Sequence, residues 1–139
     1  MIYLDTHAAA WLYAGLIDQF DPKLLPAIDE AALRVSPMVE LELQYLKEIG
    51  RTSEGGKTVL SDLETKLSVQ VCDEPFAHVI AIALGQTWTR DPFDRIIVAQ
   101  AALTNSSLLT KDQAIRRHYP LAFWTEEEFS AATTLFGRD

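Results

Sequence analysis

The sequence contains only one cysteine, Cys72, so it cannot form an internal disulfide. Disulfides are common in secreted domains and rare in the reducing cytosol, and we therefore expect a cytoplasmic protein. Cys72 ends an alternating run over residues 68–72, which indicates a small buried side chain on a strand and not a nucleophile. The sequence also lacks the Cys/His spacing of a zinc site.

Long apolar runs are absent too, since no stretch approaches the roughly 18 apolar residues that cross a membrane. The chain leads directly into residues 2–5 without a basic segment followed by an apolar one, so we expect neither a membrane anchor nor a signal peptide. Hydrophobic residues still make up 48% of the 139 residues, which indicates a folded chain. This length predicts one domain over residues 1–139.

Basic residues are scarce: 12 lysines and arginines stand against 20 acids, for a net charge of −8. This balance argues against a large basic face that binds duplex nucleic acid regardless of sequence. It does not exclude a nuclease, because acids around a metal ion count fully in the formal charge while the ion offsets them locally.

Short apolar runs alternate with amphipathic segments along the chain. Strands are expected at residues 2–5, 33–35, 68–72, 108–109 and 121–124. Helices are expected to start near residues 6, 21, 36, 58, 74, 91, 112 and 125. The alternation predicts an α/β fold in which helices flank both faces of a central, mainly parallel sheet. In the helix at 36–50, helical spacing assigns Met38, Leu41, Tyr45 and Ile49 to the apolar face.

Acidic residues stand where the predicted elements begin or end. Asp5 closes the first strand and Asp112 follows the strand at 108–109. Ligands of parallel α/β sheets bind beyond the carboxyl ends of the strands, so these two acids fall where a ligand is expected. Glu42 lies among leucines in the helix that follows the second strand, with Glu40 as an alternative.

The segment Asp91-Pro92-Phe93-Asp94 has a simpler explanation when it is taken alone. Aspartate as the N-cap, proline at the first helical position and an acid in the first turn begin many helices. The partial positive charge of a helix N-terminus stabilises both acids without any function.

The combination of acids from four elements predicts a metal site. Carboxylates that crowd together repel one another and raise each other's pKa unless cations intervene. Hard oxygen ligands suit Mg²⁺ or Mn²⁺. Such a site suits phosphodiester hydrolysis by metal-bound hydroxide, with a second metal ion, where present, at the leaving oxygen. The acids at issue are Asp5, Glu42, Asp94 and Asp112.

Four segments resemble the PIN-domain ribonucleases, and among these the VapC toxins of prokaryotic toxin–antitoxin pairs. The segments are Tyr3-Leu4-Asp5-Thr6-His7, Val35-Ser36-Pro37-Met38 with Glu42 downstream, residues 90–101 (Arg-Asp-Pro-Phe-Asp-Arg-Ile-Ile-Val-Ala-Gln-Ala), and Leu109-Thr110-Lys111-Asp112. The resemblance covers nearly the whole chain and implies a PIN-like three-layer sandwich. One departure is Thr89, where close relatives often have histidine.

The resemblance implies metal ligands at Asp5, Glu42 in preference to Glu40, Asp94 and Asp112. Asp91 is expected to be a cap that supports them, with a direct contact to the metal as the alternative. Thr6 and Thr110 are expected to hydrogen-bond the ligand carboxylates, although a local turn or cap bond explains these hydroxyls equally well. Basic residues around the acidic stretch either form a solvated face or contact RNA phosphate. They are Arg90, Arg95, Lys111, Arg116 and Arg117.

The function implied is an endoribonuclease toxin that depends on Mg²⁺ or Mn²⁺, cleaves RNA, dimerises and is neutralised by a VapB-like antitoxin. The helices on either side of residues 50–57 are expected to contact the antitoxin. His7 is expected to pack or lie at the surface, and Trp11, Trp88 and Trp124 to belong to the core or an interface, in preference to a base-stacking role.

Two other functions stay open. An aspartyl-phosphate signalling or phosphatase domain needs a nucleophilic aspartate, but Asp5 is followed by Thr6-His7 and not by a second acid two residues on. The other alternative is a PIN fold that only binds protein, against which the retained acids argue.

Overall fold

The computed structural model describes residues 1–136, and within them five strands form one parallel sheet. The strands are β1 (Ile2–Leu4), β2 (Leu33–Val35), β3 (Gln70–Val71), β4 (Ser107–Leu109) and β5 (Ala122–Phe123). Their order is β3-β2-β1-β4-β5, so the first strand is central, with Tyr3 paired to Arg34 on one side and Leu108 on the other. The predicted parallel sheet is confirmed.

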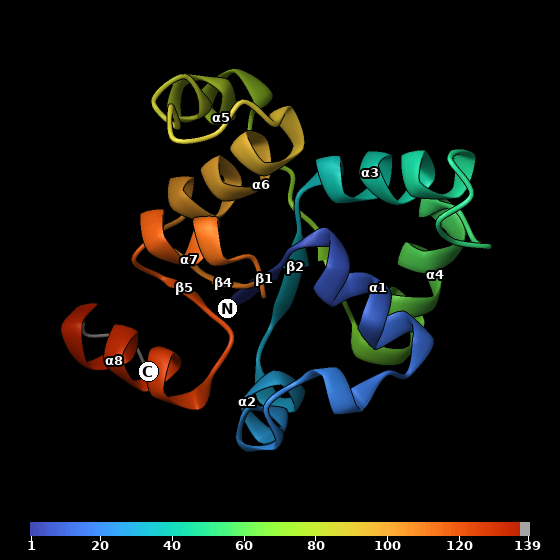
Figure 1. Cartoon of the computed structure of the whole chain (residues 1–139), viewed down its shortest axis with the longest axis horizontal. Helices are drawn as coiled ribbons and strands as arrows, with labels where there is room; N and C mark the ends of the chain where they lie inside the picture. Colours follow the sequence, from blue (N-terminus) through green and yellow to red (C-terminus); the bar gives the residue numbers. More distant parts are fainter. Residues whose placement is uncertain (137–139) are drawn as a thin grey trace.

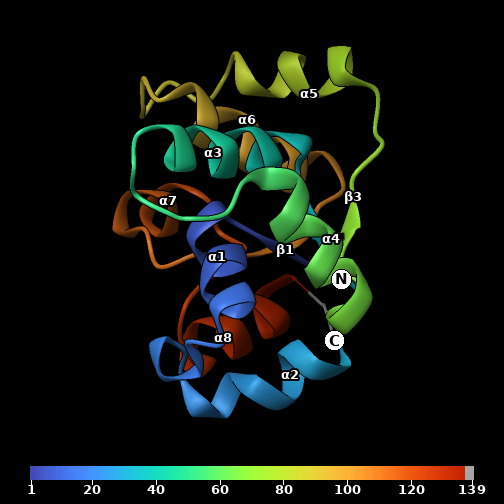
Figure 2. The ribbon, with the colours of Figure 1, turned by 90° about the vertical axis from the view of Figure 1, so that its right-hand side faces the viewer.

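Helices pack on both faces of this sheet, which confirms the three-layer α/β sandwich (Figure 1). In the described residues the helices are α1 (Thr6–Ala14), η1 (Ile17–Gln19), η2 (Pro22–Leu24), α2 (Leu25–Glu30), α3 (Pro37–Glu48), α4 (Gly56–Leu67), α5 (Phe76–Ala83), α6 (Pro92–Leu103), α7 (Gln113–His118) and α8 (Glu126–Phe136). Helices α1, α3 and α4 contact one another, and α5 lies along α6 (Figures 1 and 2). No helix in this part of the chain is long and apolar enough to cross a bilayer.

Helix α6 is the most buried helix of the described chain, with every residue from Ile96 to Ala101 buried. It begins as the sequence predicts, with Asp91 as the N-cap and Pro92 in the first turn. Its buried Gln100 accepts a hydrogen bond of 2.5 Å from the hydroxyl of Ser36, which is also the N-cap of α3. This bond connects the start of α3 to the centre of α6. The candidate site depends on this connection.

The prediction of the apolar face of α3 was wrong for three of its four residues, since only Met38 is partly buried and packs against the core. Val39 and Leu43 are the buried residues of this helix, whereas Leu41 is 57% exposed and Tyr45 and Ile49 are exposed as well. Helix α3 has apolar residues on two sides, and helical spacing alone does not show which side meets the core. The side with Val39 and Leu43 packs inward, and the other leaves an apolar stripe at the surface.

The third strand is shorter than predicted. Only Gln70 and Val71 pair with β2, and both are exposed at the edge of the sheet. Helix α4 ends at Leu67, and its C-cap Ser68 has a left-handed φ of 56°. The chain is therefore still turning where a strand was expected. Cys72 is buried and free, as its place at the end of this run predicts.

Candidate active site

A cavity of about 510 Å³ lies where the carboxyl ends of β1 and β4 meet the starts of α1, α6 and α7. It is lined by Asp5, Thr6, His7, Trp11, Glu42, Asp91, Asp94, Ile97, Lys111, Asp112 and Ile115. Two larger cavities among the described residues, of 710 and 740 Å³, are lined by at most two acids each. The acids predicted from the sequence therefore share one cavity at the expected edge of the sheet.

Asp5 is buried at the floor of the site, directly after the central strand. Its Oδ1 accepts a hydrogen bond of 2.8 Å from the Ala8 N–H, because Asp5 is the N-cap of α1. Its Oδ2 accepts one of 2.5 Å from the Thr110 hydroxyl. Burial raises the pKa of Asp5, the two hydrogen bonds act against that rise, and the charge of Asp112 adds to it.

Glu42 reaches the cavity from α3, where its Oε1 accepts a hydrogen bond from the hydroxyl of Thr6. Burial raises the pKa of Glu42, and the charges of Asp91 and Asp5 raise it further. Glu40 lies on another side of α3, beside a separate cavity against α4. The structure thus brings Glu42, and not Glu40, to the other acids.

Asp94 lies in the first turn of α6 and is half-buried. Burial and the charges of the other acids, from Asp91 first, then Asp112, Glu42 and Asp5, raise its pKa to about 7. Asp91 itself accepts a hydrogen bond of 2.8 Å from the Phe93 N–H, as expected of a helix cap. The raised pKa thus reflects burial first and, after it, the charges of the neighbouring acids.

Asp112 is the N-cap of α7, with its Oδ1 accepting a hydrogen bond of 2.9 Å from the Ile115 N–H. Its own N–H donates to the Thr110 hydroxyl at 3.1 Å, while that hydroxyl donates to Asp5. Thr110 therefore joins two of the acids.

The five acids that line the cavity suit a hard divalent cation, because their carboxylate oxygens are hard ligands. Among the described residues, no three Asp, Glu, His or Cys side chains already stand close enough together to hold one ion. Close approach of uncompensated carboxylates is unfavourable, in keeping with this arrangement. The residues fit Mg²⁺ or Mn²⁺ in chemistry and location, and they must draw together to coordinate it.

Of the basic residues expected near the substrate, only Lys111 lines the acidic cavity. Arg95 donates from Nε and Nη2 to the carbonyl oxygen of Ala83, at 3.1 and 3.0 Å, and so closes the end of α5. Arg90 donates to the Thr87 carbonyl at 2.8 Å. These bonds direct both guanidinium groups to backbone oxygens and away from the acids.

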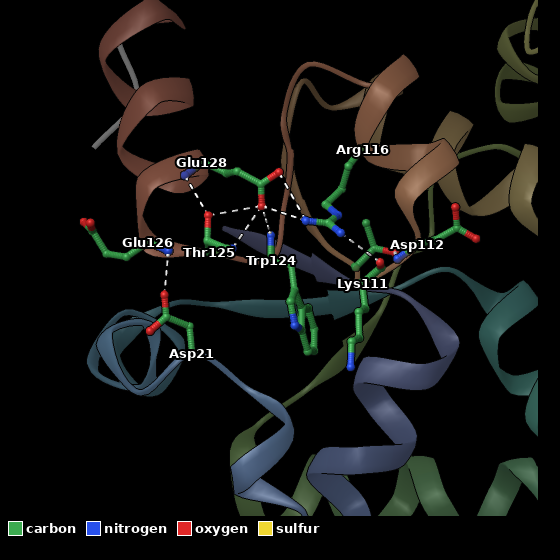
Figure 3. Close-up of polar contacts among 9 residues, drawn as sticks. Asp21, Lys111, Asp112, Arg116, Trp124, Thr125, Glu126 and Glu128 are labelled. Carbon is green, nitrogen blue, oxygen red and sulfur yellow. Dashed lines mark hydrogen bonds and ion pairs between the residues drawn. The ribbon is translucent and has the colours of Figure 1, made fainter.

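Arg116 is also occupied within the protein. Its Nη1 lies 3.2 Å from Glu128 Oε1, and its Nη2 donates to the carbonyl oxygen of Lys111 at 3.3 Å (Figure 3). Arg116 therefore fixes the backbone that carries Lys111, whereas Arg117, the next residue, is exposed.

His7 and Trp11 also line the cavity, although the sequence led us to expect His7 to pack or lie at the surface and Trp11 to belong to the core or an interface. Trp11 does pack against core residues, as expected, with its ring 5.6 Å from that of Trp124. The available signal was spacing: His7 and Trp11 are four residues apart on the helix capped by Asp5, so they share the face nearest the acids.

The family model of the PIN domain matches residues 2–120. The chain belongs to the PIN domain family. PIN domains are generally nucleases, and they typically use divalent metal ions, in keeping with the carboxylate-lined cavity. No curated protein sequence matches the chain significantly.

Solved structures show the same fold. A chain in the crystal structure of VapBC2 from Rickettsia felis, bound to a DNA fragment from the promoter, matches with a TM-score of 0.59 and 22% identity over 91% of this chain and 98% of that one. A chain in the structure of FitAB bound to the IR36 DNA fragment matches with a TM-score of 0.55 and 17% identity over 90% and 94% of the two chains. This PIN domain thus shares its fold with chains of both complexes.

Proposed function

We propose that this PIN domain is a divalent-metal-dependent endoribonuclease and the toxin of a VapBC-type toxin–antitoxin pair. The observation that carries the proposal is the shared cavity of Asp5, Glu42, Asp94 and Asp112 beyond the ends of β1 and β4. Burial and, after it, the charges of the neighbouring acids raise the pKa of Asp94 to about 7, and a cation among these carboxylates would favour their charged forms.

Asp5, Glu42, Asp94 and Asp112 would hold Mg²⁺ or Mn²⁺. When bound, such an ion activates a coordinated water and offsets charge on the phosphodiester. Thr110 and Thr6 orient the carboxylates of Asp5 and Glu42 through their hydroxyls, and Asp91 supports Asp94 by capping α6. Because its pKa is about 7, the half-buried Asp94 would lose its proton more readily with a cation at the site.

Lys111 is the basic residue placed to meet substrate phosphate, because it lines the same cavity as the acids. Arg90 is exposed and can add to the attraction, whereas Arg95 and Arg116 stabilise the elements around the site. Since the protein carries a net charge of −8, its affinity for RNA should depend on these few cations and fall as salt rises.

The proposed partners are a VapB-like antitoxin and a second copy of the chain. Exposed apolar residues support protein contacts on two helices: Leu41, Tyr45 and Ile49 on α3, and Phe76 on α5. A separate apolar cavity of 740 Å³ is bordered by α1, α2 and α4, and α4 is one of the two helices expected to meet the antitoxin. The VapBC2 and FitAB structures support such a pairing by analogy. We also propose a single domain over residues 1–139 and a cytoplasmic location, in line with the free Cys72.

The test is cleavage of total RNA by the purified protein, freed of any partner, with Mn²⁺. The wild type should cleave, Asp5→Asn should not, and Asp73→Asn should cleave like the wild type. Asp73 is a matched control because it also follows a strand but is exposed and lies outside the cavity. Equal cleavage by the Asp5→Asn variant would contradict the assignment of Asp5.

Two outcomes would favour the alternative functions. Acyl-phosphate trapping that labels Asp5 would favour an aspartyl-phosphate enzyme. Absence of any cleavage by the partner-free wild type with Mn²⁺ or Mg²⁺ would favour a PIN fold that only binds protein.

A further inference from the structure

Three side chains that are not acids meet at one border of the acidic cavity: His7, Trp11 and Lys111. His7 and Trp11 lie one helical turn apart on α1, with ring centroids 5.8 Å apart and planes inclined by 47°. Lys111 comes from the connection between β4 and α7, and its Nζ lies 5.6 Å from the centroid of the Trp11 ring. An aromatic surface and a cation therefore stand beside the carboxylates.

The ring of Trp11 is fixed from the core side. It meets Phe20 edge-on at a centroid distance of 6.4 Å, and Trp124 at 5.6 Å with an interplanar angle of 63°. Phe20 and Trp124 are both buried, whereas Trp11 is only partly buried and borders the cavity. A ring held in this way offers a rigid apolar surface at little cost in conformational entropy.

Lys111 covers that ring with an exposed side chain. Figure 3 shows the side chain extending towards α1, in agreement with the contact between its ammonium and Trp11. Its backbone carbonyl is held by Arg116, which is itself paired with Glu128. The main chain at Lys111 is thus anchored, while the ammonium is held over the ring by a cation–π contact worth little at an exposed site.

We propose that Trp11 stacks a base of single-stranded RNA next to the phosphate that is cut, and that Lys111 moves from the ring to an RNA phosphate when the base binds. Every base has a π face, so stacking on an aromatic ring tolerates any sequence. The base and the ammonium compete for the same ring, and a phosphate is a better partner for the ammonium than an aromatic face. His7 borders the base at one edge. This inference rests on the proposed ribonuclease function.

Trp88 shows that this arrangement is not common to all tryptophans of the chain. Its ring is stacked on His118 at 4.9 Å with an interplanar angle of 4°, and it lies outside the acidic cavity. Trp88 is therefore the matched control for Trp11.

The experiment measures binding of a short fluorescein-labelled oligoadenylate by fluorescence anisotropy, with Ca²⁺ in place of Mg²⁺. Trp11→Leu should raise the Kd about 10-fold, Trp11→Phe should raise it less, and Trp88→Leu should leave it unchanged. Lys111→Ala should reduce the slope of log K against log salt by about 1. Oligoadenylates with one abasic nucleotide at successive positions should show one position whose loss weakens binding to the wild type, and this weakening should be absent with Trp11→Leu.

Each result bears on the inference. Equal binding by the wild type and a folded Trp11→Leu variant would overturn it while leaving the ribonuclease proposal intact. If Trp11→Leu fails to fold, the abasic series with the wild type decides, and equal affinity at every position would overturn the inference. Absence of RNA binding by any form would overturn the inference together with the proposed function. RNA binding that depends on Trp11 but occurs without cleavage would contradict the proposed function and support the stacking of a base on Trp11.

Discussion

The hydroxyl of Thr110 donates a hydrogen bond of 2.5 Å to Oδ2 of Asp5, across the junction between β4 and β1. Both residues are buried, and the second carboxylate oxygen of Asp5 is held by the Ala8 N–H at 2.8 Å. The orientation of Asp5 is therefore set by protein groups before any cation binds. The proposed role of Asp5 as a metal ligand would therefore depend on Thr110, which is not itself one of the proposed ligands.

Thr110→Val should weaken Mn²⁺ binding and cleavage by about 10- to 100-fold, because it removes the hydroxyl that orients Asp5 and keeps the shape of the side chain. Thr110→Ser keeps the hydroxyl and should remain close to the wild type. The measurement is Mn²⁺ affinity by titration calorimetry, with the melting temperature as a check on the fold. If Thr110→Val and Thr110→Ser bind Mn²⁺ equally well, the hydroxyl has no part in metal binding.

Asp94 should make the metal-free protein less stable as pH rises. Its pKa in the folded protein is about 7, above the ordinary value of 3.8, so the folded state binds more protons than the unfolded state between these values. The loss of folding stability caused by ionised Asp94 is absent near pH 4 and complete above pH 7. Asp94→Asn should therefore stabilise the metal-free protein at pH 8 by about 1 kcal/mol, after allowance for solvent screening of this half-buried group.

Urea denaturation at pH 4 and pH 8 with EDTA tests this prediction, with Asp73→Asn as the control outside the cavity. The stabilising effect of Asp94→Asn should appear only at the higher pH, and added Mn²⁺ should stabilise the wild type more than the variant. An Asp94→Asn variant that is less stable than the wild type at pH 8 without metal would contradict the conclusion that ionised Asp94 destabilises the folded protein.

Gly56 should not tolerate a side chain. A Cβ atom at Gly56 would lie 2.2 Å from the backbone oxygen of Glu40, so α3 and α4 approach as closely as they do only because this residue is glycine. Gly56→Ala should cost about 1–3 kcal/mol of stability through forced backbone shifts. Gly85→Ala is the control, since its Cβ would meet the Ile82 oxygen at 3.4 Å. Equal unfolding midpoints in urea for the two variants would show that α3 and α4 can move apart to accept a Cβ atom at Gly56 without loss of stability.

Glu128 should stabilise the start of α8. Its Oε1 accepts hydrogen bonds from the N–H groups of Trp124 and Thr125, at 2.9 and 3.0 Å, and it pairs with Arg116 (Figure 3). Burial acts to raise the pKa of Glu128, but these donors outweigh it and hold the pKa below the ordinary 4.5. The stabilisation is therefore present above about pH 4.5 and is lost as pH falls through the lowered pKa.

Glu128→Gln should cost about 1 kcal/mol at pH 7, and the difference from the wild type should shrink at pH 3. Glu127→Gln is the control, because the ion pair of Glu127 with Lys23 is long at 3.9 Å and exposed to solvent screening, so it contributes little stability. Thermal unfolding at both pH values measures the effect. A loss at pH 3 as large as that at pH 7 would mean that charge on Glu128 contributes nothing.

The sequence was sufficient for features determined by neighbouring residues. Asp91-Pro92 and Thr125 with Glu128 begin helices where predicted, because capping depends on a few adjacent side chains. The edge of the sheet that gathers Asp5 and Asp112 could also be predicted, since both follow parallel strands.

Features that depend on distant partners could not be predicted in the same way. Spacing assigned Leu41 and Tyr45 to the apolar face of α3, but the position of α4 and the core decides which side is buried. Arg116 was expected near RNA, yet its partner Glu128 follows after a strand and a turn. The position of Trp11 beside the cavity likewise depends on a distant partner, because Lys111, whose ammonium lies over its ring, comes a hundred residues later in the chain.

Carboxylates from four elements are expected to converge on a cation, and a crystal grown with Mn²⁺ tests this most directly by anomalous diffraction. The account predicts an anomalous peak in the cavity, within coordination distance of Asp5 and Asp94, with Glu42 and Asp112 drawn towards it from their metal-free positions. A fully resolved cavity that holds water and no Mn²⁺ at saturating concentration, or a peak bound elsewhere on the surface alone, would contradict it.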